Sequence, residues 1–214
     1  MERSLIEDFR DKRALRTVEA LKKNQMDAYY VRSSAEAVEL VESLIAPNSV
    51  VTMGGSMTIS ETGIDKLVKN GSYQFLDRAR PGITPEEAQA VMRQAFTADV
   101  YLSSANAVTE NGELFNIDGN GNRVAAITYG PKSVIIVVGY NKITQDAEEA
   151  RKRVKRIASP TNAKRVNAKT PCVTTGICSD CNAPDRICAT EVLTGFQRIA
   201  NRIKVIIVDE VLGF

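Results

Sequence analysis

Short apolar segments alternate with helix-forming segments along much of the chain, and this alternation constrains the fold more than any other feature. Runs typical of strands occupy residues 27–31, 49–53, 73–76, 99–103 and 133–138. Capping boxes, in which Ser or Thr precedes Glu by three positions, mark helices that begin after Ser33 and Thr84. Strands that alternate with helices form an open, mostly parallel sheet with helices on both faces. The sequence therefore predicts an α/β, Rossmann-like fold.

Further segments predict the elements around this core. Helices are expected over residues 4–23, 59–69, 84–97 and 146–157. The first helix is expected to bury four apolar side chains, those of Leu5, Phe9, Val18 and Leu21. One β-hairpin is expected from strands over 114–117 and 124–128, joined by the turn 118–121. A second hairpin is expected in the C-terminal region, residues 190–214.

The composition narrows the classes of function. The 214 residues, 43% of them apolar, suit a single domain over 1–214. A net charge of +2 gives no reason to expect nucleic acid as a partner. The chain has no histidine, which excludes Ser-His-Asp and Cys-His catalysis. The N-terminus lacks the apolar segment of a signal peptide, and no apolar run is long enough to cross a bilayer, so a cytoplasmic protein without a membrane partner is expected.

All four cysteines lie in one short segment, within the predicted loop 170–190. They are Cys172, Cys178, Cys181 and Cys188, in the run CVTTGICSDCNAPDRIC. The inner pair, separated by two residues, has the spacing at which two thiolates grip one ion or one cluster. The sequence therefore predicts that the four thiolates serve one metal centre.

Two kinds of centre accept four thiolates, a [4Fe-4S] cluster and a zinc ion. A structural zinc site usually has two separated CxxC pairs, whereas this chain has one pair flanked by single cysteines. That spacing favours the cluster and leaves zinc as the alternative. Two disulfides are the interpretation without a metal, and a reducing cytoplasm argues against them.

The junction VVTMGGSMTISETG predicts a site for a small anion. Gly54 and Gly55 let the backbone approach a ligand, and Ser56 and Thr58 offer hydroxyls where a helix begins. Free N–H groups and the dipole of that helix favour phosphate or carboxylate. Three residues that follow other predicted strands are expected to converge there, Asn106, Arg123 and Lys142.

Several segments, taken in order, resemble the lactate-utilisation (LUD) domain family. They are GGSMT, SSANAVTENGEL, DGNGNR, VGYNKI and the ending VIIVDEVLGF, together with the cysteine run. The resemblance implies a fold of the NagB/RpiA/CoA-transferase-like superfamily. It also implies a role beside iron–sulfur proteins that oxidise L-lactate to pyruvate, which supports the cluster. A small anionic metabolite and redox proteins are then the expected partners, and the sequence leaves open whether the chain forms a homo-oligomer.

A second similarity supports an alternative function. Glu110-Asn111-Gly112 resembles the segment that carries the nucleophilic glutamate of class I CoA-transferases. A carboxylate at that position attacks a thioester and forms an acyl-enzyme. The alternative is therefore an enzyme of CoA-ester or sugar-phosphate chemistry, with Glu110 as its catalytic residue and a purely structural metal loop.

Overall fold

A six-stranded sheet forms the centre of the structure, a computed structural model that describes residues 4–214. Its strands lie in the order β1-β10-β7-β4-β2-β3, and every neighbouring pair is parallel. They are β1 (Asp27–Val31), β2 (Val50–Met53), β3 (Gln74–Leu76), β4 (Val100–Ser103), β7 (Ser133–Gly139) and β10 (Ile203–Val208). The predicted α/β, Rossmann-like class is confirmed.

A smaller sheet lies beside the first, with the strand order β8-β5-β6-β9. Its members are β5 (Ala107–Thr109), β6 (Leu114–Asp118), β8 (Ile143–Thr144) and β9 (Thr190–Thr194). β6 runs antiparallel to both β5 and β9, so β5 and β6 form a hairpin. Phe115 and Ala107 of this sheet pack against Ala150 and Val154 on the helical segment above it.

Helices account for most of the remaining regular structure in residues 4–214. They are α1 (Leu5–Lys23), α2 (Ser34–Leu44), α3 (Met57–Thr62), α4 (Ile64–Asn70), α5 (Pro85–Gln94), α6 (Asn122–Tyr129), α7 (Ala147–Arg153), α8 (Ser159–Arg165) and α9 (Pro171–Thr175). Three short elements accompany them, two 3-10 turns (Ala95–Thr97, Tyr140–Lys142) and a π-helical turn (Val154–Ala158). The capping box at Thr84 is confirmed, whereas Ser33 caps its helix through its hydroxyl alone, because the Glu36 carboxylate accepts from the amide of Arg32.

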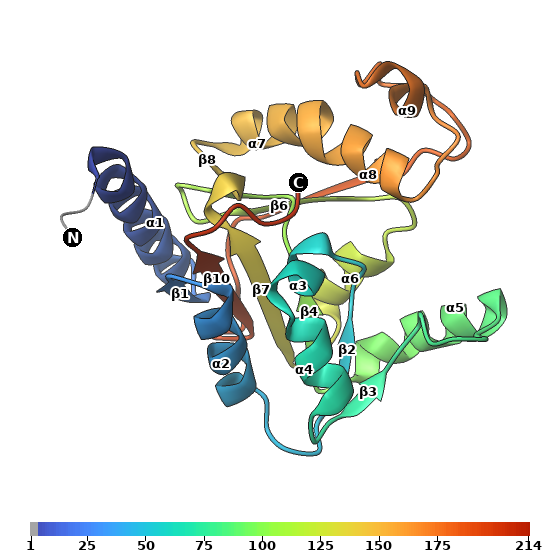
Figure 1. Cartoon of the computed structure of the whole chain (residues 1–214), viewed down its shortest axis with the longest axis horizontal. Helices are drawn as coiled ribbons and strands as arrows, with labels where there is room; N and C mark the ends of the chain where they lie inside the picture. The colour runs from blue at the N-terminus through green and yellow to red at the C-terminus, as the bar shows by residue number, and fades with distance from the viewer. Residues whose placement is uncertain (1–3) are drawn as a thin grey trace.

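Strand β7 shows why helices cover both faces of the main sheet. Val134, Ile136 and Val138 pack on one face with side chains of α1 and α6. Ile135 and Val137 pack on the other face with α2, α3 and α4. All five side chains are fully buried, so the strand is apolar throughout, as strands of parallel sheets are. Figure 1 shows α2, α3 and α4 together over one face of this sheet.

Two predicted hairpins are wrong. Residues 122–129 form helix α6 instead of a return strand, because the Asp118 carboxylate accepts from the amides of Arg123 and Val124 and so caps a helix. The C-terminal hairpin over 190–214 is absent, since β9 pairs with β6 in the small sheet and β10 lies between β1 and β7 in the large one.

The helix predictions also need correction in detail. Leu5 and Phe9 are exposed, and only Val18 and Leu21 of the four expected side chains are buried. The helix predicted to end at Lys69 is divided in two at Gly63, which adopts a φ of +82°. No helix in the described part of the chain is long and apolar enough to span a membrane.

Candidate functional site

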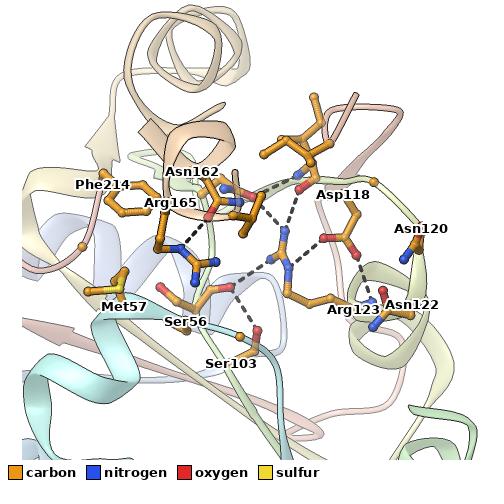
Figure 2. Close-up of a pocket in the computed structure, with 18 of the residues that line it drawn as sticks. Ser56, Met57, Ser103, Asp118, Asn120, Asn122, Arg123, Asn162, Arg165 and Phe214 are labelled. Carbon is orange, nitrogen blue, oxygen red and sulfur yellow. Dashed lines mark hydrogen bonds and ion pairs between the residues drawn. The ribbon is translucent and has the colours of Figure 1, made fainter. Parts of the chain in front are cut away.

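A cavity lies where the path of the chain across the main sheet reverses direction. From β2 the chain continues to β3 at the sheet edge, whereas the next strand of this sheet after β4 is β7, on the other side. Open α/β sheets bind ligands at such a point, outside the carboxyl ends of the strands. Here a polar cavity of about 420 Å³ opens between the loops after β2 and β4, helix α8 and residues 184–187 (Figure 2).

Most residues predicted to bind an anion line this polar cavity. They are Gly55, Ser56, Thr58, Asn106, Arg123 and Lys142. Gly54 does not line it and packs instead against Tyr101 and Ser103. A carbon added at Gly54 would lie 3.0 Å from the Tyr101 hydroxyl and 3.3 Å from Ser103 Oγ. Gly55 does line it, and an added carbon would lie 3.0 Å from Nη2 of Arg78. Gly54 therefore allows close packing behind the wall, and Gly55 keeps the wall open.

The helix that follows this loop is too short to supply the dipole that the sequence suggested. Helix α3 has six residues before Gly63 ends it. Its cap is also occupied, because Ser56 Oγ accepts from the amide of Ile59 at 3.3 Å. Helix dipoles are a property of aligned peptides over several turns. Any attraction for an anion therefore comes mainly from side chains.

Lys142 is the most buried of the basic side chains that line the cavity, with 4% of its surface exposed. Its Nζ donates to Thr58 Oγ1 at 2.9 Å and to Ser104 Oγ at 3.0 Å. Burial is the main cause that lowers the pKa of Lys142 to about 7, and the charges of Arg153 and Arg123 act in the same direction. A lysine in this position is substantially neutral near pH 7.

Arg123 holds the cavity wall together. Its guanidinium donates to five protein oxygens over distances of 2.6 to 3.1 Å, on Asp118, Ser104, Asn116, Asn106 and Ile117. A guanidinium has five N–H donors, so this network leaves none for a ligand. The positive charge still acts on the cavity, but Arg123 contacts the wall rather than its contents. Figure 2 shows the guanidinium turned toward Asp118 and the loop above it.

Three arginines that the sequence did not single out also line the polar cavity, Arg78, Arg165 and Arg186. Arg165 donates through Nε to Asn162 at 2.8 Å, and its side chain reaches from α8 toward Ser56 (Figure 2). Besides Lys142, whose pKa is lowered by burial, the lining thus carries four arginines and two carboxylate side chains, those of Asp118 and Asp185. Such an excess of positive charge attracts an anion.

The four cysteines line a second, small cavity, which we call the thiol cavity. Cys172 lies on α9, and the other three follow it in residues 176–189, which form neither helix nor strand. All four thiols are free and partly buried. The structure thus gathers around one space the four residues that the sequence predicted to serve one centre.

Two buried polar atoms of residues that line the thiol cavity lack hydrogen-bond partners, Ser159 Oγ and Arg186 Nε. Buried donors without partners are rare, and each one suggests a nearby group that accepts its hydrogen bond. Both atoms can donate to sulfur. Arg186 and Ile187 also line the polar cavity, so the two cavities share a wall.

The thiols are not arranged for a single metal ion. No three His, Cys, Asp or Glu side chains in residues 4–214 are grouped closely enough to hold one. The thiol cavity measures only about 10 Å³. A zinc ion needs four sulfurs at bonding distance from one point, whereas a cluster spreads its four thiolates over several irons. Four cysteines are a donor set that a cluster or a zinc ion accepts, and a cavity of this size admits neither unless residues 176–189 move apart.

Glu110, the predicted catalytic residue of the alternative function, lies away from both cavities. Its carboxylate accepts from Arg13 Nε at 2.7 Å and from Arg16 Nη2 at 3.3 Å, which ties the loop before β6 to α1. Glu110 does not line the polar cavity. The two ion pairs give this carboxylate a structural role, and its catalytic role stays a prediction.

The chain matches the family model of the LUD domain over residues 14–208. No curated protein matches it significantly. A solved structure of a DUF162 family protein from Deinococcus radiodurans is similar, with a TM-score of 0.53, 14% identity, and coverage of 93% of this chain and 98% of that one. This likeness concerns the fold.

Two other solved structures show a lower similarity. eIF2B beta from Chaetomium thermophilum has a TM-score of 0.39 and 17% identity, covering 54% of this chain and 44% of that one. The tetrameric eIF2B-beta2-delta2 complex from C. thermophilum has a TM-score of 0.35 and 20% identity, covering 53% and 46%. At these scores the likeness is confined to part of the fold.

Proposed function

This chain belongs to the LUD domain family, and we propose that it is an iron–sulfur protein of lactate or related 2-hydroxy-acid utilisation. In this proposal the four cysteines hold a [4Fe-4S] cluster, and the polar cavity binds a small carboxylate. The observation that carries it is the shared wall: Arg186 and Ile187 line both the thiol cavity and the polar cavity. A redox centre and a metabolite would then lie on two sides of the same short segment.

The residues around the thiols suit a centre of anionic sulfurs, which this proposal takes to be the cluster. A [4Fe-4S] cluster supplies one-electron transfer, and hydrogen bonds to its sulfurs help set its potential. Ser159 Oγ and Arg186 Nε are buried donors that lack partners and belong to the lining. Lys155, whose Nζ is 2.6 Å from Asp180 Oδ1, anchors the loop to the π-helical turn and adds positive charge beside it. Positive charge and free donors both stabilise an assembly of anionic sulfurs.

The basic lining supports a carboxylate in the polar cavity. Arg165 uses one of its five donors in the protein and leaves the two Nη groups for a ligand, whereas Arg123 uses all five. A guanidinium with both Nη groups available matches the two oxygens of a carboxylate. Ser56 and Thr58 add hydroxyls on the opposite wall.

The cluster is tested on protein purified without oxygen. The expected result is a broad visible absorption and about four irons and four sulfides for each chain. Cys178→Ser and Cys181→Ser should each lose the metal and expose residues 176–189 to protease. Thr174→Ala is the matched control, because Thr174 lies on α9 but does not line the thiol cavity. Equal iron content in the control and both cysteine variants would exclude the site, and stoichiometric zinc in place of iron would exclude the cluster.

The anion site is tested separately by calorimetric titration with L-lactate, pyruvate and sulfate. Gly55→Val should block binding by filling the wall, and Arg165→Gln should weaken it about tenfold, as expected for the loss of one charged hydrogen-bonding group. Lys164→Gln is the matched control, since it removes a neighbouring charge on α8 that does not line the cavity. Affinities that are equal in wild type and all three variants would place the anion site elsewhere.

A further inference from the structure

The surroundings of Lys142 suit a nucleophilic amine better than an ion-pair partner. Its two hydrogen-bond partners are hydroxyls, Thr58 Oγ1 and Ser104 Oγ, and among the described residues the carboxylate that acts on it, that of Glu61, forms no ion pair with it. A buried ammonium without a carboxylate is costly, so the neutral amine is favoured. A neutral amine has two N–H groups and one lone pair. If both N–H groups donate to the hydroxyls, the lone pair is unoccupied.

The backbone beside Lys142 is arranged to keep its amine in place. Gly213 has a φ of +59°, and a carbon added there would lie 2.7 Å from Thr58 Oγ1 and 3.2 Å from Nζ of Lys142. The amide of Gly213 in turn donates to Glu61 at 2.6 Å, and Gly213 and Phe214 line the cavity. The C-terminal residues thus pack close to the amine, and Lys142 also lines the polar cavity.

We infer that Lys142 forms an imine with a 2-oxo acid bound in the polar cavity. This inference rests on the proposed anion site, because the carboxylate of the 2-oxo acid would be held by the arginines that line it. The Nζ lone pair forms a bond to the carbonyl carbon as the C=O π electrons move to oxygen. The carbonyl oxygen then leaves as water with the two amine hydrogens, and a C=N bond remains. No oxidant or reductant is needed.

The depressed pKa makes this chemistry effective at neutral pH. An amine must be unprotonated to attack a carbonyl, and desolvation is a known way to activate lysine. Burial lowers the pKa of Lys142 to about 7. The groups that face it are Arg123 and Arg153, which lower the pKa, and Glu61, which raises it. An ordinary lysine at pH 7 is almost entirely protonated.

The imine is tested by trapping with pyruvate and cyanoborohydride at pH 7, followed by peptide mapping of the whole protein. Lys142 should acquire one carboxyethyl group at least about tenfold faster than other lysines, because its neutral fraction at pH 7 is far larger. Sulfate should slow the modification by competing for the arginines. Lys142→Met should lose the fast adduct, and Lys204→Met is the matched control: burial also lowers the pKa of Lys204, but that lysine does not line the cavity.

The outcomes separate this inference from the proposed function. A fast, sulfate-sensitive adduct on Lys142 of the wild-type protein supports the imine even if Lys142→Met does not fold. Adducts that spread evenly over surface lysines, or none at all, overturn it. If calorimetry shows pyruvate bound in the cavity while trapping fails, the imine is wrong and the anion site stands. If neither calorimetry nor trapping detects pyruvate, the proposed anion site is wrong as well.

Discussion

The walls of the polar cavity and of the thiol cavity are held by different kinds of contact. The polar cavity is built on strand ends and on a buried network, in which Arg123 alone donates five hydrogen bonds. The thiol cavity is built on residues 176–189, which lack regular structure and are tied down by surface contacts such as Lys155–Asp180. The first cavity is therefore held by regular structure and buried contacts, whereas the second is held by a segment without regular structure and by exposed contacts.

The largest effect should follow from breaking the Arg123 network. Arg123→Gln leaves the Asp118 carboxylate and several carbonyl oxygens without their partner, and loss of one member of a partly buried charged network costs about 3 kcal/mol of unfolding free energy. Urea unfolding of the metal-free protein measures this. Asp180→Asn, which breaks an exposed ion pair of the cysteine loop, should leave the midpoint unchanged. Equal losses in the two variants would contradict the comparison.

The pH dependence of stability should report the buried amine. The pKa of Lys142 in the folded chain, about 7, lies below its ordinary value of 10.5, so the unfolded chain binds more protons between these pH values. Stability therefore contains a component that rises with pH in this window, by about 2 kcal/mol from pH 7 to pH 9. Below pH 7 both states are protonated, so the pH dependence disappears and the full cost of burying the charged amine remains. The difference between wild type and Lys142→Met isolates it, and parallel pH profiles for the two proteins would show that the amine is not depressed.

Substitutions at two glycines with positive φ allow a direct comparison of how tightly the two regions are packed. Gly213→Ala must strain the backbone and push its new carbon against Thr58 Oγ1, so it should cost about 2 kcal/mol. Gly176→Ala, at φ +71° in the cysteine loop, meets nothing within 4 Å and should cost about 1 kcal/mol from backbone strain alone. Thermal unfolding of both variants gives the ranking, and the reverse order would mean that the C-terminal residues do not pack as described.

The smallest effect is expected at Ser159. In the metal-free protein Ser159→Ala removes a buried hydroxyl that lacks a partner, so stability should rise by about 1 kcal/mol. In the cluster-loaded protein the same change should remove a hydrogen bond to sulfur and make the reduction potential more negative. Calorimetry and a redox titration measure the two quantities. A potential that does not move would show that the hydroxyl does not reach the cluster.

The main sheet was predictable because its signals are local. Strand β7 is a continuous apolar run, and the caps at Ser33 and Thr84 lie within a few residues of the helices they begin. The Asp118-Gly119-Asn120-Gly121 segment misled because its composition suits a hairpin turn as well as a helix start. The Asp118 carboxylate favours the helix over the hairpin, because it accepts hydrogen bonds from the amides of residues 123 and 124. That contact is visible only in the folded chain.

The sequence by itself determined the α/β class, the segment that carries all four thiols, and six of the residues that line the polar cavity. All of these six but Arg123 follow strands of the parallel sheet, whose carboxyl ends meet at one edge. Only the tertiary structure decided which charges are free to act. In the folded chain every N–H donor of the Arg123 guanidinium is used within the protein, whereas Arg165 keeps two free Nη groups. Lys142 is buried between two hydroxyls. The physical reason is that hydrogen-bond satisfaction and desolvation depend on neighbours distant in the chain, and no local pattern encodes them.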